Sequence, residues 1–392
     1  MATRQRSITT LPYELLGEVF THYASVCPDA PIILGAVSHL FRLVAYSTPS
    51  AWSYLKLSDG DGRSKTALWF AMSKACHVDV QIQMAEVRHG TTNNNTSVVE
   101  VPAALEALRS HTDRITSLCL RTGTQAHARA VLTAIYSDAV TDGTVLRSLR
   151  ISAAAITPGP PPAFPAIPSI TDLETTNVAL RGLPSLDLAR LQRLRIVQPI
   201  ISAPLGADDI LDLISAAPRL RRLKVDARIA DAAAVAHETQ FLPQLVELHL
   251  RANNIDALLD RFIVPALHVL HLSDLDGKRA DASDDVGAAL HRLLVRMELG
   301  NGDVKSNELR VFELVGVAVE RGNAVWERCV QRMKAVEVFS VEEPCEKEGL
   351  VQDEVAAVAQ TEEPQARPII KAGFCFGFGA AESDFAARRE GN

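Results

Sequence analysis

The sequence predicts an α/β protein in which a short helical N-terminal region precedes a long array of alternating strands and helices. Two patterns carry this prediction: apolar residues recur at helical spacing near the N-terminus, and an apolar-x-x-apolar-x-apolar strand signal recurs nine times between Ile115 and Val341, with Thr175 in place of the last apolar residue in the third. The chain has 392 residues, of which 47% are hydrophobic, so it can bury a sizeable core. From this length we expect about two or three domains.

The first predicted element is a helix that begins in LPYELLGEVF, with Thr10 as its cap and Pro12 in its first turn. Its apolar residues are Leu11, Leu15, Leu16, Val19, Phe20 and Tyr23. They form a stripe that is too wide for a single contact. We therefore expect one edge of this helix to face its own core and another edge to face a partner.

Two further short helical patterns follow, through Ile33, Val37, Phe41 and Val44, and Thr48-Pro49 ends them before Trp52. The prediction for residues 8–57 is a three-helix bundle with Trp52 as an apolar anchor. A bundle this small buries little surface by itself. Insertion of a helix into a partner's groove would relieve the exposure.

Residues 58–113 are predicted to be a linker together with the first cap elements of the array that follows. The polar stretches SDGDGRSK and RHGTTNNNTS flank a helix, or a strand or two, within this range.

Residues 114–340 contain the repeated unit. Its strand signals begin at Ile115, Leu146, Ile170, Leu191, Leu220, Leu245, Leu267, Leu309 and Val336. The spacing is 21 to 31 residues in all steps but one, the 42 residues from Leu267 to Leu309, where we expect an insertion around DLDGKRADASDD. Helical patterns lie between the strands, such as ADDILDLISAAPRL with Asp208 or Asp209 as its cap.

A strand and a helix every 20 to 30 residues resembles the leucine-rich repeat in an irregular form. The resemblance implies an α/β solenoid, because no single unit can bury its apolar face and neighbouring units must stack. An ordinary α/β domain with parallel strands is the alternative, but it offers no reason for the repeated spacing.

Strand alternation predicts which side chains the stacked strands present on the concave face of the sheet. The first row on this face is Ser117, Ser148, Asp172, Arg193, Arg222, Glu247, Val269 and Val311, and the second row is Cys119, Arg150, Glu174, Arg195, Lys224, His249, His271 and Glu313. Four cations, Arg193, Arg195, Arg222 and Lys224, then fall on two adjacent strands.

Like charges this close repel one another unless something offsets them. One interpretation is a binding site for an acidic or phosphorylated segment of a target protein, since guanidinium groups bind such anions bidentately. His249 and His271 occupy equivalent places and join this candidate site. The alternative is a solvated patch neutralised by Asp226, Glu247 or the acidic tail.

Charge and composition exclude several classes of function. The net charge is −7, and residues 341–392 form an acidic tail with eleven Asp or Glu against five Lys or Arg. We expect this tail to be flexible. No domain-wide basic excess predicts nucleic-acid binding. No apolar run is long enough for a membrane span and no secretory signal opens the chain, so we expect a cytoplasmic or nuclear protein.

The sequence predicts neither a catalytic site nor a metal or cofactor site. The six cysteines form no Cys-x-x-Cys pair, which favours reduced thiols over disulfides or zinc. No Gly-x-Ser-x-Gly, His-Glu-x-x-His or Gly-x-x-x-x-Gly-Lys motif occurs. The prediction is a binding protein and not an enzyme.

The N-terminal region resembles the F-box in a form common in fungal proteins, with the runs LPxELLxEIF, VCxxWRxxA and TPxLW. The matching residues are Leu11, Pro12, Leu15, Leu16, Val19 and Phe20, then Val37 and Arg42, then Thr48, Pro49 and Trp52; Ser38 replaces the usual Cys and Phe41 the usual Trp. The resemblance covers about 47 residues.

It implies a substrate-receptor subunit of a Skp–cullin–F-box ubiquitin ligase, which contacts the cullin through the Skp adaptor. The implied adaptor-binding residues are Leu11, Pro12, Leu15, Leu16, Val19, Val37, Phe41 and Trp52. The repeats would hold the target. A second hypothesis is an adaptor-independent leucine-rich-repeat scaffold, in which the N-terminal helices only cap the array.

Overall fold

The computed structural model describes residue 8 and residues 11–58, 62–84, 100–136, 144–156, 163–230, 239–275, 282–299, 309–317, 323–333 and 336–342. The helices are α1 (Tyr13–Val26), α2 (Ala30–Val37), α3 (His39–Ser47), η2 (Pro49–Trp52), α4 (Gly62–Met72), α5 (Glu100–Arg109), α6 (Gln125–Ile135), η3 (Leu180–Leu186), α7 (Ala207–Ser215), α8 (Ile255–Leu259), α9 (Ala282–Leu299) and α10 (Ala324–Arg332). The predicted acidic tail, apart from its first two residues, lies outside the described residues.

The strands are β1 (Tyr54–Leu57), β2 (Val78–Gln83), β3 (Ile115–Thr124), β4 (Ser148–Ala155), β5 (Asp172–Thr176), β6 (Arg193–Val197), β7 (Arg222–Asp226), β8 (Gln240–Phe241), β9 (Glu247–Ala252), β10 (Phe262–Ile263), β11 (Val269–Asp274), β12 (Val311–Val315) and β13 (Val338–Glu342). Eleven of these form one sheet in which every described pair is parallel, while β8 and β10 pair separately.

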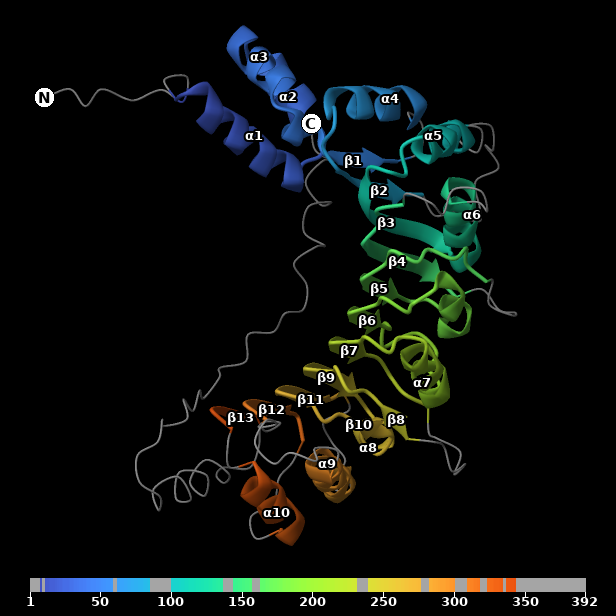
Figure 1. Cartoon of the computed structure of the whole chain (residues 1–392), viewed down its shortest axis with the longest axis vertical. Helices are drawn as coiled ribbons and strands as arrows, with labels where there is room; N and C mark the ends of the chain where they lie inside the picture. Colours follow the sequence, from blue (N-terminus) through green and yellow to red (C-terminus); the bar gives the residue numbers. More distant parts are fainter. Residues whose placement is uncertain are drawn as a thin grey trace, which may run out of the picture.

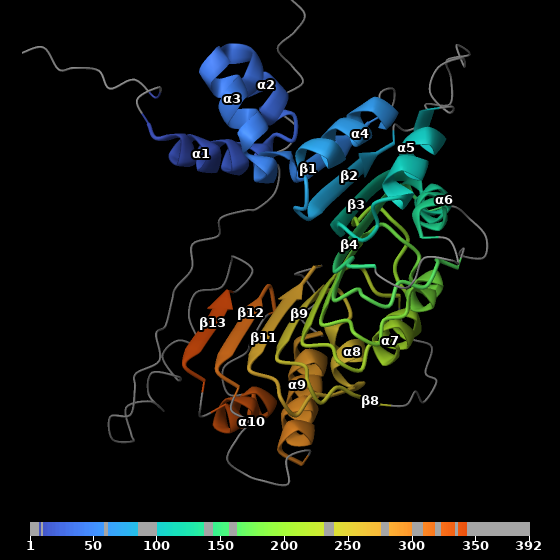
Figure 2. The same cartoon turned by 45° about the horizontal axis from the view of Figure 1, so that its top comes forward.

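The large sheet follows the order of the sequence. Its strands run β1-β2-β3-β4-β5-β6-β7-β9-β11-β12-β13, so each strand pairs with the strands before and after it in the sheet. The sheet is curved, with helices α4 to α10 along its outer side and α1 to α3 at the β1 end (Figure 1). Figure 2 shows the last strands of the sheet, β9, β11, β12 and β13, side by side. The predicted α/β class is correct.

The repeated apolar pattern sets the register of these strands. The inward residues Leu149, Leu173, Leu194, Leu223 and Leu248 are register partners from one strand to the next, and all are buried. The first apolar residue of each unit, from Ile115 to Leu309, is buried as well. Because side chains alternate along a strand, burying these positions turns the intervening polar positions toward the concave face.

The sheet begins earlier than the sequence predicted. β1 lies inside the range assigned to the helical bundle, and β2 lies in residues 58–113, which were assigned to a linker together with the first cap elements. β1 is too short to carry the full pattern, because it places only Leu55 and Leu57 inward.

The long step before β12 contains α9, the 18-residue helix that packs against α8 and α10. Residues 276–281, the central part of the predicted insertion, lie outside the described residues. The prediction that Asp208 or Asp209 caps α7 is wrong. The cap position of this helix is Gly206, and both aspartates lie in its first turn. A carboxylate in the first turn still interacts favourably with the helix dipole.

The N-terminal helices pack on one another through aromatic side chains. The rings of Phe20 on α1 and Phe41 on α3 meet edge to face, with centroids 5.3 Å apart. Leu16 and Phe20 are buried on the same side of α1. Pro12 occupies the cap position of α1, so the helix begins at Tyr13 and the predicted capping residue, Thr10, lies outside the described residues.

Three residues predicted to contact an adaptor are interior residues of this protein. Leu16, Phe41 and Trp52 are 0%, 8% and 1% exposed. They are removed from the docking surface, because a side chain that already fills its own core is not available to a partner.

Trp52 instead joins the helices to the sheet. Its ring meets that of Trp69 on α4 edge to face at 5.1 Å, and its indole N–H donates to the Ala45 carbonyl of α3 at 2.8 Å. The Trp69 indole N–H donates to the Tyr54 carbonyl of β1, also at 2.8 Å. Lys65 of α4 adds an ion pair with Asp29 at 2.6 Å. The helical segment and the first strands therefore share one core.

None of the described helices combines the length and apolar character needed to cross a membrane.

An inward position of β5 carries a polar side chain whose hydroxyl is unpaired. Thr175 of β5 stands between Ile151 of β4 and Ile196 of β6, is 1% exposed, and its hydroxyl has no hydrogen-bond partner. A buried hydroxyl without a partner costs about 1–3 kcal/mol.

We expect Thr175→Val to raise the free energy of unfolding by about 1 kcal/mol, since valine keeps the shape and removes the unpaired hydroxyl. Thr175→Ser is the matched control: it keeps the hydroxyl and deletes a buried methyl group, so it should lower stability by about 1 kcal/mol. Urea unfolding monitored by circular dichroism measures both. A Thr175→Val variant less stable than the parent would contradict the interpretation.

The neighbouring residues Leu15 and Leu16 test the two sides of α1. Leu16→Ala should lower the free energy of unfolding by about 2–5 kcal/mol, because it leaves a cavity in the core. Leu15 is 46% exposed, so Leu15→Ala should change it by no more than about 0.5 kcal/mol. Equal losses in the two variants, measured in the same unfolding experiment, would refute this assignment of faces.

Candidate binding surfaces

Exposed apolar side chains concentrate on the N-terminal helices. Within residues 8–68 they are Ile8, Leu11, Tyr13, Leu15, Val19, Tyr23, Val26, Ile32, Ile33, Val37, Leu43, Tyr46 and Leu68. The rest of the described chain adds Ile200, Ile201, Phe241, Val246 and Leu299. Apolar exposure gathered in one small region is typical of an interaction surface.

Helix α1 has three faces. The first is buried and contains Leu16, Phe20 and Ala24. The second is exposed and apolar, with Leu15 and Val19 one helical turn apart. The third is polar and lines a groove. The predicted division of the wide apolar stripe into a buried edge and an exposed edge is therefore correct.

Five of the predicted adaptor-binding residues remain available on the surface: Leu11, Pro12, Leu15, Val19 and Val37. Leu11, Leu15 and Val19 follow one another at four-residue steps, which places them along one side of the helix and its entry. Val37, at the end of α2, is 64% exposed. We call Leu11, Leu15, Val19 and Val37 the exposed apolar set.

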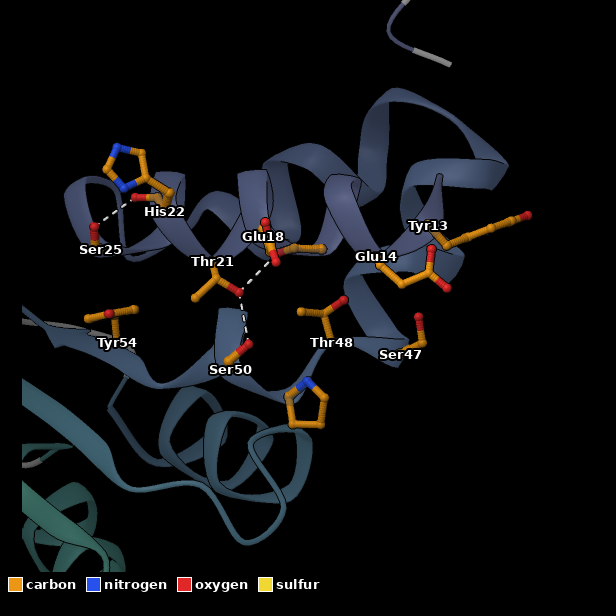
Figure 3. Close-up of a pocket in the computed structure, with 12 residues that line it drawn as sticks. Tyr13, Glu14, Glu18, Thr21, His22, Ser25, Ser47, Thr48, Ser50 and Tyr54 are labelled. Carbon is orange, nitrogen blue, oxygen red and sulfur yellow. Dashed lines mark hydrogen bonds between the residues drawn. The ribbon is translucent and has the colours of Figure 1, made fainter. Parts of the chain in front are cut away.

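The groove beside the third face of α1 was not predicted. It has a volume of about 670 Å³ and lies between α1 and the segment that runs from Ser47 to Tyr54 (Figure 3). The Thr21 and Ser50 hydroxyls join across it at 2.8 Å. Its position depends on how η2 turns back against α1, and the α1 residues Glu14, Glu18 and His22 carry no sign of it in the sequence.

Most of the residues that line the groove are polar, although much of its lining surface is apolar. Glu14 and Glu18 line it from α1, together with His22 (Figure 3). Ser25 donates to the main-chain carbonyl of His22 at 2.7 Å, and no hydrogen bond joins the His22 ring to a hydroxyl among the described residues. A nucleophile activated by histidine needs that bond.

The concave face of the sheet is the second candidate surface, and the predicted rows are confirmed by the strand register. Arg193 pairs with Arg222 and Arg195 with Lys224 across β6 and β7. Lys224 pairs with His249, and His249 with His271, on the next strands.

The predicted repulsion among the four cations is largely offset. Arg193 forms an ion pair with Asp172 of β5, Arg195 with Glu174 at 3.1 Å, and Arg222 with Glu247 at 3.0 Å. The alternative of a neutralised patch is thus correct for these three, although Asp172 and Glu174, which supply two of the partners, were not foreseen in that role. The sequence contained the information for these two ion pairs, because each carboxylate occupies the same predicted row as its arginine partner on the adjacent strand.

Lys224 differs from these arginines. Its ammonium makes no ion pair or hydrogen bond with any described residue. Exposed ion pairs contribute little stability, about 0–1 kcal/mol each, so the paired arginines remain free to exchange partners. The Lys224 ammonium can bind an anion without first losing an ion-pair partner.

His249 and His271 form a stacked pair beside Lys224. Their ring centroids are 3.9 Å apart and their planes differ by 12°. His249 Nε2 donates to Glu247 Oε1 at 2.7 Å, and His271 Nδ1 donates to Glu313. Burial lowers the pKa of His249, and the charges of His271 and Lys224 lower it further, while Glu247 acts in the opposite direction.

No cluster of three or more His, Cys, Asp or Glu side chains able to hold a metal is found in the part of the chain that the structure describes. Cys27, Cys76, Cys119 and Cys329 are free thiols. Cys345 and Cys375 lie outside the described residues. Burial raises the pKa of Cys329 to about 12, so this thiol stays protonated and unreactive near neutral pH.

A scan of the chain against models of known protein families gives no match, and no curated protein matches it.

Proposed function

We propose that the chain is a substrate-receptor subunit of a Skp–cullin–F-box ubiquitin ligase. In this proposal the exposed apolar set docks on the Skp adaptor, which links the chain to a cullin, and the concave face holds a target protein. Other subunits perform ubiquitin transfer. The observation that carries the proposal is the exposed apolar edge of α1, which coincides with the F-box-like run that contains Leu11, Pro12 and Leu15.

The proposal includes a finer description of the fold: an F-box-like three-helix bundle followed by an irregular leucine-rich-repeat-like solenoid. It is supported by the strand order of the large sheet, in which the strands lie in the order of the sequence with only β8 and β10 left out. It is also supported by the repeated inward residues, of which Leu194 and Leu223 are one pair. Parallel strands with helices along one side are what stacked strand–helix units produce.

The energetics of docking favour a specific partner. Each exposed leucine or valine that an adaptor buries fully contributes about 1.5–3 kcal/mol. Leu15 and Val19 are 46% and 45% exposed, so each has roughly half of its surface left to bury. Several such residues together can offset the loss of translational and rotational freedom on association.

The second candidate function is an adaptor-independent scaffold. The contact between Trp52 and Trp69 favours it, because this contact ties the N-terminal helices to the first strand of the sheet, as a terminal cap would be tied. A cap alone, however, gives no use to the apolar residues on its outer side.

The experiment is a pull-down of the full chain with a purified Skp adaptor. A fragment that ends at residue 57 is unsuitable, because it would separate Trp52 from Trp69 and β1 from β2. The full chain should bind, and Leu15→Asp should weaken binding by at least about tenfold, because an unpaired carboxylate would be forced into an apolar interface.

The matched control is Ile201→Asp, which places the same charge at a side chain that is 97% exposed, on the loop between β6 and α7. This variant should bind as the parent does. Circular dichroism of both variants should show an unchanged fold. Parental binding by Leu15→Asp, or no adaptor binding by the parent chain, would reject the docking proposal and favour the scaffold.

A further inference from the structure

A row of four side chains on the concave face has a charge at each end and two neutral rings between them. Lys224 of β7, His249 of β9, His271 of β11 and Glu313 of β12 are successive register partners. The two imidazole rings are stacked, and their side chains are 29% and 24% exposed, so solvent and ligands can reach them. The arrangement places the Lys224 ammonium next to the stacked imidazole rings.

Each imidazole keeps one nitrogen that can accept a further proton. His249 uses Nε2 to bind Glu247, which leaves Nδ1, and His271 uses Nδ1 to bind Glu313, which leaves Nε2. A histidine changes its charge nearest to neutral pH of all ordinary side chains. Protonation of His249 would place a cation in a stack whose ring centroids are 3.9 Å apart, and the Glu247 carboxylate beside His249 favours that charged form.

The surrounding charges decide which ring responds to a ligand. From β7, Arg222 is paired with Glu247, while Lys224 stands free and opposes protonation of His249. From β9, Arg251 is paired with Asp226 at 3.6 Å. From β12, Glu313 stands at the His271 end of the row. The stacked His271 opposes protonation of His249 more strongly than Lys224 does, and the Lys224 ammonium is the permanent positive charge that opposes it without an ion-pair partner among the described residues.

An anion held by Lys224 changes that balance. It offsets the ammonium, and it adds a negative charge beside His249, so both effects favour the protonated ring. By linkage, a ligand that promotes proton uptake binds more tightly when protons are more abundant.

We propose that Lys224, His249 and His271 form a proton-linked binding site for an acidic peptide segment of the target. This inference rests on the proposed function, since it takes the concave face as the surface that holds the target. The proposal narrows the candidate site from four cations to Lys224, whose ammonium has no ion-pair partner among the described residues.

Peptide carboxylates fit the site better than a metal ion does. Each ring already donates one N–H to a carboxylate, which leaves a different ring nitrogen on each histidine, Nδ1 of His249 and Nε2 of His271, as a possible metal ligand. Lys224 repels a cation and attracts a carboxylate. The extended strand row also suits an extended peptide, whose successive side chains can reach Lys224 and then Arg195, the neighbour of Lys224 on β6.

The test uses the full chain and a tetramethylrhodamine-labelled peptide with a run of glutamates, with a glutamine version of the peptide as control. Fluorescence anisotropy is measured between about pH 8 and about pH 6 at constant ionic strength. Glutamate carboxylates, with a pKa of about 4.3, stay ionised over this range, so only histidines titrate. Affinity for the glutamate peptide should rise as the pH falls, by up to about tenfold per pH unit for each proton taken up.

Three variants assign the effect to residues. Lys224→Gln should weaken binding about tenfold throughout the pH range. His249→Gln can still donate to Glu247 but cannot titrate, so it should bind with little dependence on pH. His268→Gln is the matched control: His268 immediately precedes β11, its ring contacts the Ala266 carbonyl, and it takes no part in the stack. It should behave as the parent does.

Three results overturn the inference: failure of the glutamate peptide to bind at any pH, full pH dependence in His249→Gln, or binding of the glutamine peptide with equal affinity. The outcome is independent of the adaptor test. A chain that binds the adaptor and not the peptide loses this inference alone, whereas one that binds the peptide and not the adaptor loses the docking proposal and keeps the site.

Discussion

Burial of the repeated inward residues is the constraint on which the rest of the structure depends. A strand that carries Leu-x-Ile or Leu-x-Leu on its inner side cannot leave those residues in water, and its own helix covers only part of them. The next unit supplies the remainder, so the strands align in register and in the order of the chain. Every side chain between the inward positions is then committed to the concave face. The rows of charged residues are a consequence of this packing and not of any local preference.

The tryptophan contact between η2 and α4 extends the same core to the N-terminal helices. Because Trp52 bonds to α3 and packs on Trp69, while Trp69 bonds to β1, the helices cannot move independently of the first strands without breaking buried hydrogen bonds. This explains why the aromatic residues Phe41 and Trp52, which look like contact residues in the sequence, are interior residues. The exposed edge of α1 is held in a fixed orientation relative to the sheet.

The sequence was sufficient for the sheet and insufficient for its surroundings. The register of β3 to β13 follows from spaced apolar residues alone, and the rows on the concave face were predicted residue by residue. β1 was missed because it is too short to carry the full pattern. Leu15 and Leu16 show a further limit, since both fit a helical apolar stripe and only packing decides which one is buried. The ion pairs of Asp172 and Glu174 depend on side-chain conformations, and the groove beside α1 depends on the path of η2. The spacing of apolar residues predicts neither feature.

The order of the strands has a mechanical consequence. Since each strand of the sheet pairs only with the strand before it and the strand after it in the sheet order, the strand-to-strand hydrogen bonds that hold an end strand are those with the single strand next to it. A force that pulls the first and last strands of the sheet apart would break these strand pairs from the ends inward. A sheet whose first and last strands pair with each other would instead resist until it ruptured as a whole. This protein is built to yield gradually under tension.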